Sequence, residues 1–123
     1  MATSQATSTL VNTTELKHSK TKNLQNEQIG EIDELLIEPD TGVVRFAVLS
    51  VGGFLGLGTT RVAVPWRALA ITRQRDGTVT MVVDATKERL ERAPRVEGKN
   101  YERLYTPEAA EPIFVYWEVD YTD

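Results

Sequence analysis

The feature that most constrains this chain is a glycine-rich segment that separates two apolar runs. The segment SVGGFLGLGTTRVAVPW spans residues 50–66. Its four glycines are Gly52, Gly53, Gly56 and Gly58. Two kinds of structure use such a segment, namely a phosphate-binding loop that leads into a helix and a sharp bend between two strands. The residues that follow the glycines distinguish the two.

The glycine spacing and the following residues both favour a bend between strands. From Gly53 the order is G-x-x-G-x-G, the reverse of the dinucleotide-binding pattern, and the Gly-Lys-Ser/Thr of a P-loop is absent. Val62, Val64 and Trp66 then alternate with other residues, which is typical of a half-buried strand. Because no helix begins here, the loop lacks the free backbone amides that bind phosphate. The sequence therefore predicts a bend, a following strand and no bound cofactor.

Short strand-like runs and strong turn signals recur through the rest of the chain. The apolar spacing in residues 29–37 suits either a helix or a strand, but Gly30 and the turn sequence that follows favour a strand with a bend or bulge. Asp76-Gly77 predicts a β-hairpin, and Pro65 predicts the end or the edge of a strand. The predicted strands cover residues 29–37, 43–51, 59–66, 71–75 and 78–83, and a short helix covers residues 86–92.

The two ends of the chain differ from its middle. Residues 1–9 are small and polar and are predicted to form a flexible tail, while residues 10–95 form the folded domain. Residues 96–123 form a C-terminal extension that is predicted to end in an interface or edge strand. The alternating residues that would line one face of this strand are Ile113, Val115, Trp117, Val119 and Tyr121.

These elements predict a mostly β fold with short connections. A meander of short strands must bury one face, and closing the sheet on itself removes its unpaired edges. We therefore expect a small, mostly antiparallel β-barrel with one short helix and the C-terminal extension.

The net charge, the lack of cysteine and the lack of long apolar runs exclude several classes of function. The chain has 123 residues, a net charge of −4 and no cysteine, which excludes thiol chemistry and disulfides and argues against binding to nucleic acid. It shows no export signal and no apolar run long enough for membrane insertion, so a cytoplasmic location is expected. His18 is the single histidine and has no nucleophile motif with it. We therefore expect a protein that is not an enzyme and that binds no metal and no cofactor.

Residues 10–95 resemble the PRC-barrel family, and the segment of residues 23–69 carries the matching features. The matching features are Ile29-Gly30-Glu31-Ile32, the Thr41-Gly42 turn, the Gly52–Gly56 stretch and Val64-Pro65-Trp66. The family is named after the cytoplasmic domain of the photosynthetic reaction-centre H subunit. It includes the C-terminal domain of a ribosome-maturation factor and small stand-alone bacterial proteins. Thr21 stands where such proteins are expected to have Val. The resemblance implies a β-barrel that acts in assembly or docking, without shared catalytic residues.

The functional expectation is a non-enzymatic protein-binding or assembly module that forms a homodimer. Its predicted contact surfaces are the C-terminal strand and the tip of the glycine-rich loop, although the loop residues would alternatively plug one end of the barrel. The loop residues are Phe54, Leu55 and Leu57. Two alternatives remain open, namely a small-molecule or cofactor-binding protein and, by fold analogy, an accessory factor of photosynthetic or electron-transfer complexes.

Overall fold

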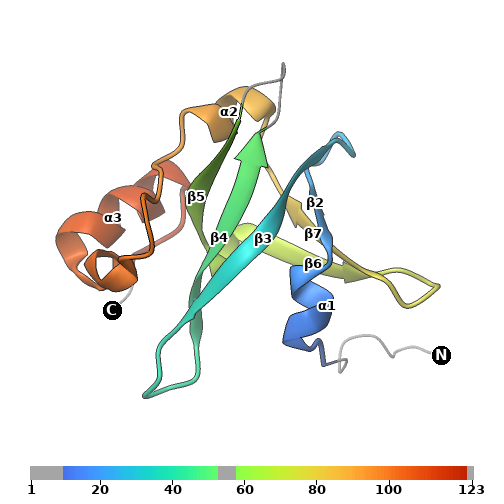
Figure 1. Cartoon of the computed structure of the whole chain (residues 1–123), viewed down its shortest axis with the longest axis horizontal. Coiled ribbons are helices and arrows are strands. Elements are labelled where there is room, and N and C mark those ends of the chain that lie inside the picture. Colours follow the sequence, from blue (N-terminus) through green and yellow to red (C-terminus); the bar gives the residue numbers. More distant parts are fainter. Residues whose placement is uncertain (1–9, 53–57, 122–123) are drawn as a thin grey trace.

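A bent six-stranded sheet forms the centre of the molecule (Figure 1). The computed structural model describes residues 10–52 and 58–121. The strands are β2 (Lys20–Lys22), β3 (Gln28–Ile37), β4 (Val44–Gly52), β5 (Thr59–Pro65), β6 (Leu69–Arg73) and β7 (Val79–Val83). The helices are α1 (Thr13–Lys17), α2 (Lys87–Glu91) and α3 (Pro107–Tyr116), with 3-10 turns η3 (Trp66–Ala68) and η4 (Tyr101–Tyr105). No described helix has the length and apolar character needed to cross a membrane.

The sheet is mostly antiparallel, as predicted, but it is not a closed barrel. The strand order is β5-β4-β3-β2-β7-β6, so β5 and β6 are its two edges. Among the described strands, only β2 and β7 pair in parallel. Closure fails because the chain leaves β5 at Pro65 through η3, and the outer edge of β5 is already bonded elsewhere. There the Val96 amide donates to the Arg61 carbonyl over 2.8 Å.

The glycine-rich bend joins two strands, as predicted. Gly52 ends β4 with a φ of 116° and is the Cα partner of Thr59, the first residue of β5. No helix begins at Thr59, because residues 59–65 continue the antiparallel pairing to Pro65. The positive φ explains a glycine at residue 52, because other L-residues rarely adopt it.

The remaining strands and turns also agree with the sequence prediction. Register shifts interrupt β3 between Ile32 and Glu34 and again after Leu36, as expected for a bulged strand. A Cβ at residue 30 would overlap the carbonyl oxygen of Ser50, so this position of β3 requires glycine. The β6–β7 hairpin turns at Asp76-Gly77, and Thr86 caps α2 by accepting the Arg89 amide at 3.1 Å.

The predicted C-terminal strand is wrong, because residues 107–116 form helix α3. Pro107 occupies the first turn, where a missing N–H costs nothing. Ala110, Ile113 and Phe114 are buried at the three- and four-residue spacing of a helix face. The apolar residues that alternate after Pro112 therefore also fit the spacing of a helix face. Pro112 itself lies inside the helix.

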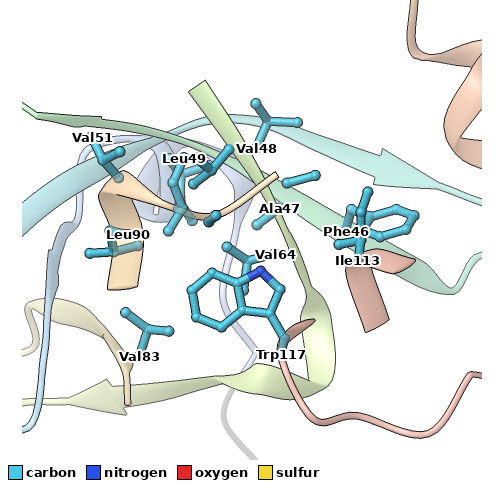
Figure 2. Close-up of a cluster of buried hydrophobic side chains, with 14 of the residues drawn as sticks. Phe46, Ala47, Val48, Leu49, Val51, Val64, Val83, Leu90, Ile113 and Trp117 are labelled. Atoms are coloured by element: carbon cyan, nitrogen blue, oxygen red, sulfur yellow. The ribbon is translucent and has the colours of Figure 1, made fainter. Parts of the chain in front are cut away.

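The core lies on both sides of β4. Residues 46–49 of β4 have no solvent exposure, and because neighbouring strand residues point to opposite faces, both faces must be covered. Figure 2 shows Leu49 and Val51 beside Leu90 of α2, whereas Phe46 lies beside Ile113 of α3. The Phe46 and Phe114 rings meet edge to face, with centroids 5.4 Å apart. Helix α3 therefore covers the second face of this strand.

Candidate functional site

The C-terminal residues predicted to share one contact face do not share one. Ile113 and Trp117 are each 5% exposed and belong to the core, whereas Val115 is 69% exposed. Val119 and Tyr121 are half-buried beyond the end of α3 and pack against the core. A helix turns about 100° per residue, so alternate residues separate onto different sides. Of this set, Val115 alone keeps the exposure that a contact residue needs.

The other predicted contact residues belong to the tip of the glycine-rich loop. Phe54, Leu55 and Leu57 lie outside the described residues. Whether they plug the sheet or contact a partner therefore stays a prediction.

Arg61 attaches the chain after α2 to the sheet. From β5, its side chain donates to the Asp33 carboxylate at 2.8 Å, to the Gly98 carbonyl and to the Tyr101 hydroxyl. Burial alone would lower the pKa of the Arg61 guanidinium, but the hydrogen bonds with Asp33 and Tyr101 outweigh it and raise that pKa. The charge is therefore held by its partners and acts as a structural link.

Arg89 makes the corresponding link between α2 and α3. Its guanidinium carbon lies 5.4 Å from the Tyr116 ring centroid and 5.3 Å from the Trp117 ring centroid. It also donates to the Tyr116 carbonyl at 2.6 Å. The two arginines together explain why the predicted interface segment is packed against its own domain.

The edge of β6 is the first candidate contact site. The Gln74 amide donates to the Thr78 carbonyl at 2.7 Å, so Gln74 and Thr78 form a hydrogen-bonded pair of the β6–β7 hairpin. Because bonded and non-bonded pairs alternate, Leu69, Ile71 and Arg73 direct their backbone groups away from β7. The Leu69 amide bonds to the Trp66 carbonyl. In the described part of the chain, nothing pairs with the outward backbone groups of Ile71 and Arg73.

A polar hollow of about 720 Å³ on the sheet is the second candidate site. It lies over β2, β7 and β6, between the end of α1 and the β2–β3 turn. The sheet register places Lys20, Thr80 and Thr72 in one row across the three strands. Its lining residues are His18, Ser19, Lys20, Lys22, Asn23, Leu24, Asn26, Thr72, Gln74, Thr78, Val79, Thr80 and Val82.

The acidic residues with lowered pKa values serve local structure. A hydrogen bond from Arg73, followed by one from the Asn12 amide, lowers the pKa of Glu15, and Asn23 does the same for Glu27. Hydrogen bonds from Thr78 lower the pKa of Asp76 in the hairpin turn. Within residues 10–52 and 58–121, no three His, Asp or Glu side chains come together as a metal site would require.

The sequence prediction missed the hollow because it missed β2, and it missed the edge of β6 because it expected a closed barrel. The three residues Lys20–Lys22 carry no apolar pattern, and their partners on β7 lie far along the chain. Helix α1 was also not predicted, although its capping box was readable. The Asn12 side chain accepts the Glu15 amide at 2.8 Å, and the Glu15 carboxylate accepts the Asn12 amide in return.

Comparison with known families identifies the segment that contains the sheet. A family model described as the PRC-barrel domain matches residues 14–90. This segment contains the six described strands and all of α2 except its last residue, and it ends before η4 and α3. No curated protein matches the chain. Both candidate sites therefore lie within the matched segment.

Proposed function

The chain belongs to the PRC-barrel domain family, and on this premise we propose that it is a non-enzymatic assembly module that pairs with a second copy of itself through β6. The observation that carries this proposal is the open edge of β6. Unpaired backbone groups at a sheet edge form a template for another strand. Natural edges are commonly blunted by charged residues, above all Lys, by Pro or by a bulge. Strand β6, with the sequence LAITR, has no Lys, no Pro and no bulge, and its one charged residue, Arg73, is paired with Glu15 at 3.2 Å.

The geometry of the edge suits antiparallel pairing around a twofold axis at Ile71. Each Ile71 would donate its amide to the other Ile71 carbonyl, and each Arg73 amide would meet the Leu69 carbonyl of the second copy. The Leu69 amide is not required, because it already bonds to Trp66. Such an interface is isologous, since the same patch serves both copies.

The side chains of β6 are compatible with this pairing. Ile71 is 38% exposed and would meet the same apolar side chain across the axis. Ala70 and Thr72 lie on the opposite face and would face each other, and both are small. A second copy would therefore place Ile71 next to Ile71 and Ala70 next to Thr72 at the centre of the edge, with Arg73 opposite Leu69 at its ends. This self-complementarity favours a second copy over an unrelated strand.

Analytical ultracentrifugation of the full chain tests the proposal with a matched pair of variants. We expect the unaltered protein to form dimers at micromolar concentration and Ile71→Lys to be monomeric, because a charge at the centre of the edge opposes pairing. Val115→Lys is the control, since it adds the same charge at an exposed apolar residue of α3. It should remain dimeric. Far-UV circular dichroism verifies that both variants fold.

Two outcomes would overturn this proposal. One is an unaltered protein that stays monomeric at high micromolar concentration. The other is an Ile71→Lys variant that folds and still forms dimers as readily as Val115→Lys does.

A further inference from the structure

We propose that the polar hollow over β2, β7 and β6 binds a small oxyanion that carries phosphate or carboxylate groups. This site is separate from the outward backbone groups of β6 that the proposed dimer would use. Its volume of about 720 Å³ falls within the range of ordinary small-ligand sites. Three features of the hollow suit such a ligand, namely the charge of its lining, the row of donors across the strands and the hydrogen bonds that hold its walls.

The charge of the hollow is opposite to that of the whole chain. Lys20 and Lys22 line it and, among the residues that the structure describes, no Asp or Glu does, although the chain carries a net charge of −4. In the described residues, neither lysine forms an ion pair, whereas Lys87 outside the hollow is paired with Glu27 at 3.5 Å. Glu31 of β3 is the cross-strand neighbour of Lys20, but the two form no ion pair. The hollow thus offers two ammonium groups that form no ion pair with the described residues.

Neutral hydrogen-bond donors stand next to this charge. Thr80 is the Cα partner of Lys20 on one side and of Thr72 on the other, and adjacent strands lie about 4.8 Å apart. Gln74 follows at the end of β6. Among the described residues, the side chains of Thr72, Thr80 and Gln74 have no hydrogen-bond partner. Ammonium and hydroxyl groups in one row are suited to a ligand with several acceptor oxygens.

The walls of the hollow are held in place by hydrogen bonds. The Asn23 side chain accepts the Gln25 and Glu27 amides at 3.1 and 2.9 Å and donates to the Glu27 carboxylate at 2.7 Å. At the other end, the Ser19 hydroxyl donates to the Leu16 carbonyl at 2.6 Å. These bonds fix the chain on both sides of β2. A ligand would therefore meet a site that is largely formed in advance.

Chemical-shift titration of the ¹⁵N-labelled full chain tests this inference. The probes are inorganic pyrophosphate, citrate as a carboxylate without phosphate, and glycerol as an uncharged control. We expect the shifts to concentrate at Lys20, Lys22, Thr72 and Thr80 with the two anions and to be absent with glycerol. A larger response to pyrophosphate identifies a phosphate ligand, and a larger response to citrate identifies a carboxylate ligand.

A matched pair of double variants separates the site from general attraction of anions. Lys20→Gln with Lys22→Gln should raise the Kd for the better probe by about tenfold or more, because it removes both charged donors. Arg92→Gln with Lys99→Gln removes the same charge outside the hollow and should leave the Kd within about twofold. Equal weakening in both double variants, or shifts spread over all basic residues, would overturn the inference. Ile71→Lys should keep anion binding, so failure of the dimer leaves this test intact.

Discussion

The two halves of the sheet differ in how they are covered. In β4 and β5, residues 46–49 and 62–64 have no solvent exposure, so both faces of these strands lie inside the protein. In β6 all five residues are exposed or half-buried, and in β7 every second residue is buried. The same sheet therefore combines a half that is covered on both faces with a half that is covered on one.

The difference arises from where the chain places its helices. Helix α3 packs over β4 and β5, and Arg61 and Arg89 hold the C-terminal segment there. On the outer face of β2, β7 and β6 the structure has instead a polar hollow and an open edge. Buried apolar side chains are therefore concentrated in one half of the sheet, and the other half is available for contacts.

Removal of a ring from the covered half should have the largest effect. Phe114→Ala removes the ring that lies between Phe46 and Tyr121, at centroid distances of 5.4 and 5.3 Å. We expect a loss of about 3–5 kcal/mol in the free energy of unfolding, measured by urea denaturation. Ile71→Ala in the uncovered half is the control and should cost about 1 kcal/mol or less. Comparable losses in the two variants would contradict the division into halves.

Loss of the Arg61 link should have a smaller effect that stays local. Arg61→Ala removes hydrogen bonds to Asp33, Gly98 and Tyr101, so we expect a loss of about 1–2 kcal/mol. Hydrogen exchange should accelerate at the Val96 amide, which bonds to the Arg61 carbonyl, more than at amides of β7. Uniform acceleration across the sheet would show that the link stabilises the whole domain.

Replacement of the buried Thr21 should increase stability. Thr21 has no solvent exposure, and its hydroxyl lacks a hydrogen-bond partner among the described residues. Thr21→Val keeps the shape and removes the unpaired group, so we expect a gain of about 1 kcal/mol in thermal or urea unfolding. Ser19→Ala is the contrasting variant, because the Ser19 hydroxyl is bonded to Leu16, and it should destabilise the protein. A destabilised Thr21→Val protein would indicate that this hydroxyl has a partner.

Acid should weaken the uncovered half through its carboxylates. Hydrogen bonds lower the pKa values of Glu15, Glu27 and Asp76 below those in the unfolded chain, which are about 4. The native state therefore binds these protons less readily, so the stabilisation is complete above about pH 5 and is lost as the pH falls through the native pKa values. Melting temperatures from pH 7 to pH 3 measure this loss. In Glu15→Gln the decline below pH 5 should be shallower.

The turns of this fold could be predicted from local sequence, whereas the packing of α3 on the sheet and the open edge of the sheet could not. The Gly52 bend and the Asp76-Gly77 hairpin depend on neighbouring residues, and both were predicted correctly. The apolar residues around Ile113 fit both the two-residue period of a strand and the three- to four-residue period of a helix. Which of the two forms depends on packing against β4, and local sequence does not reveal that packing. The open edge at β6 depends on the order in which strands that are distant in the sequence pair in the sheet. Lys20–Lys22 shows no strand pattern of its own, because its partners come from β3 and β7.

The parallel pairing of β2 with β7 has a consequence for synthesis of the chain. Lys20 pairs with Thr80, so the two strands lie roughly 60 residues apart in the sequence. During translation, β3, β4 and β5 can form their hairpins as they leave the ribosome, but β2 lacks one neighbour until β7 has emerged. The earliest-made strand of the sheet is thus among the last to be fully paired, and a chain arrested before Thr80 leaves it half-paired.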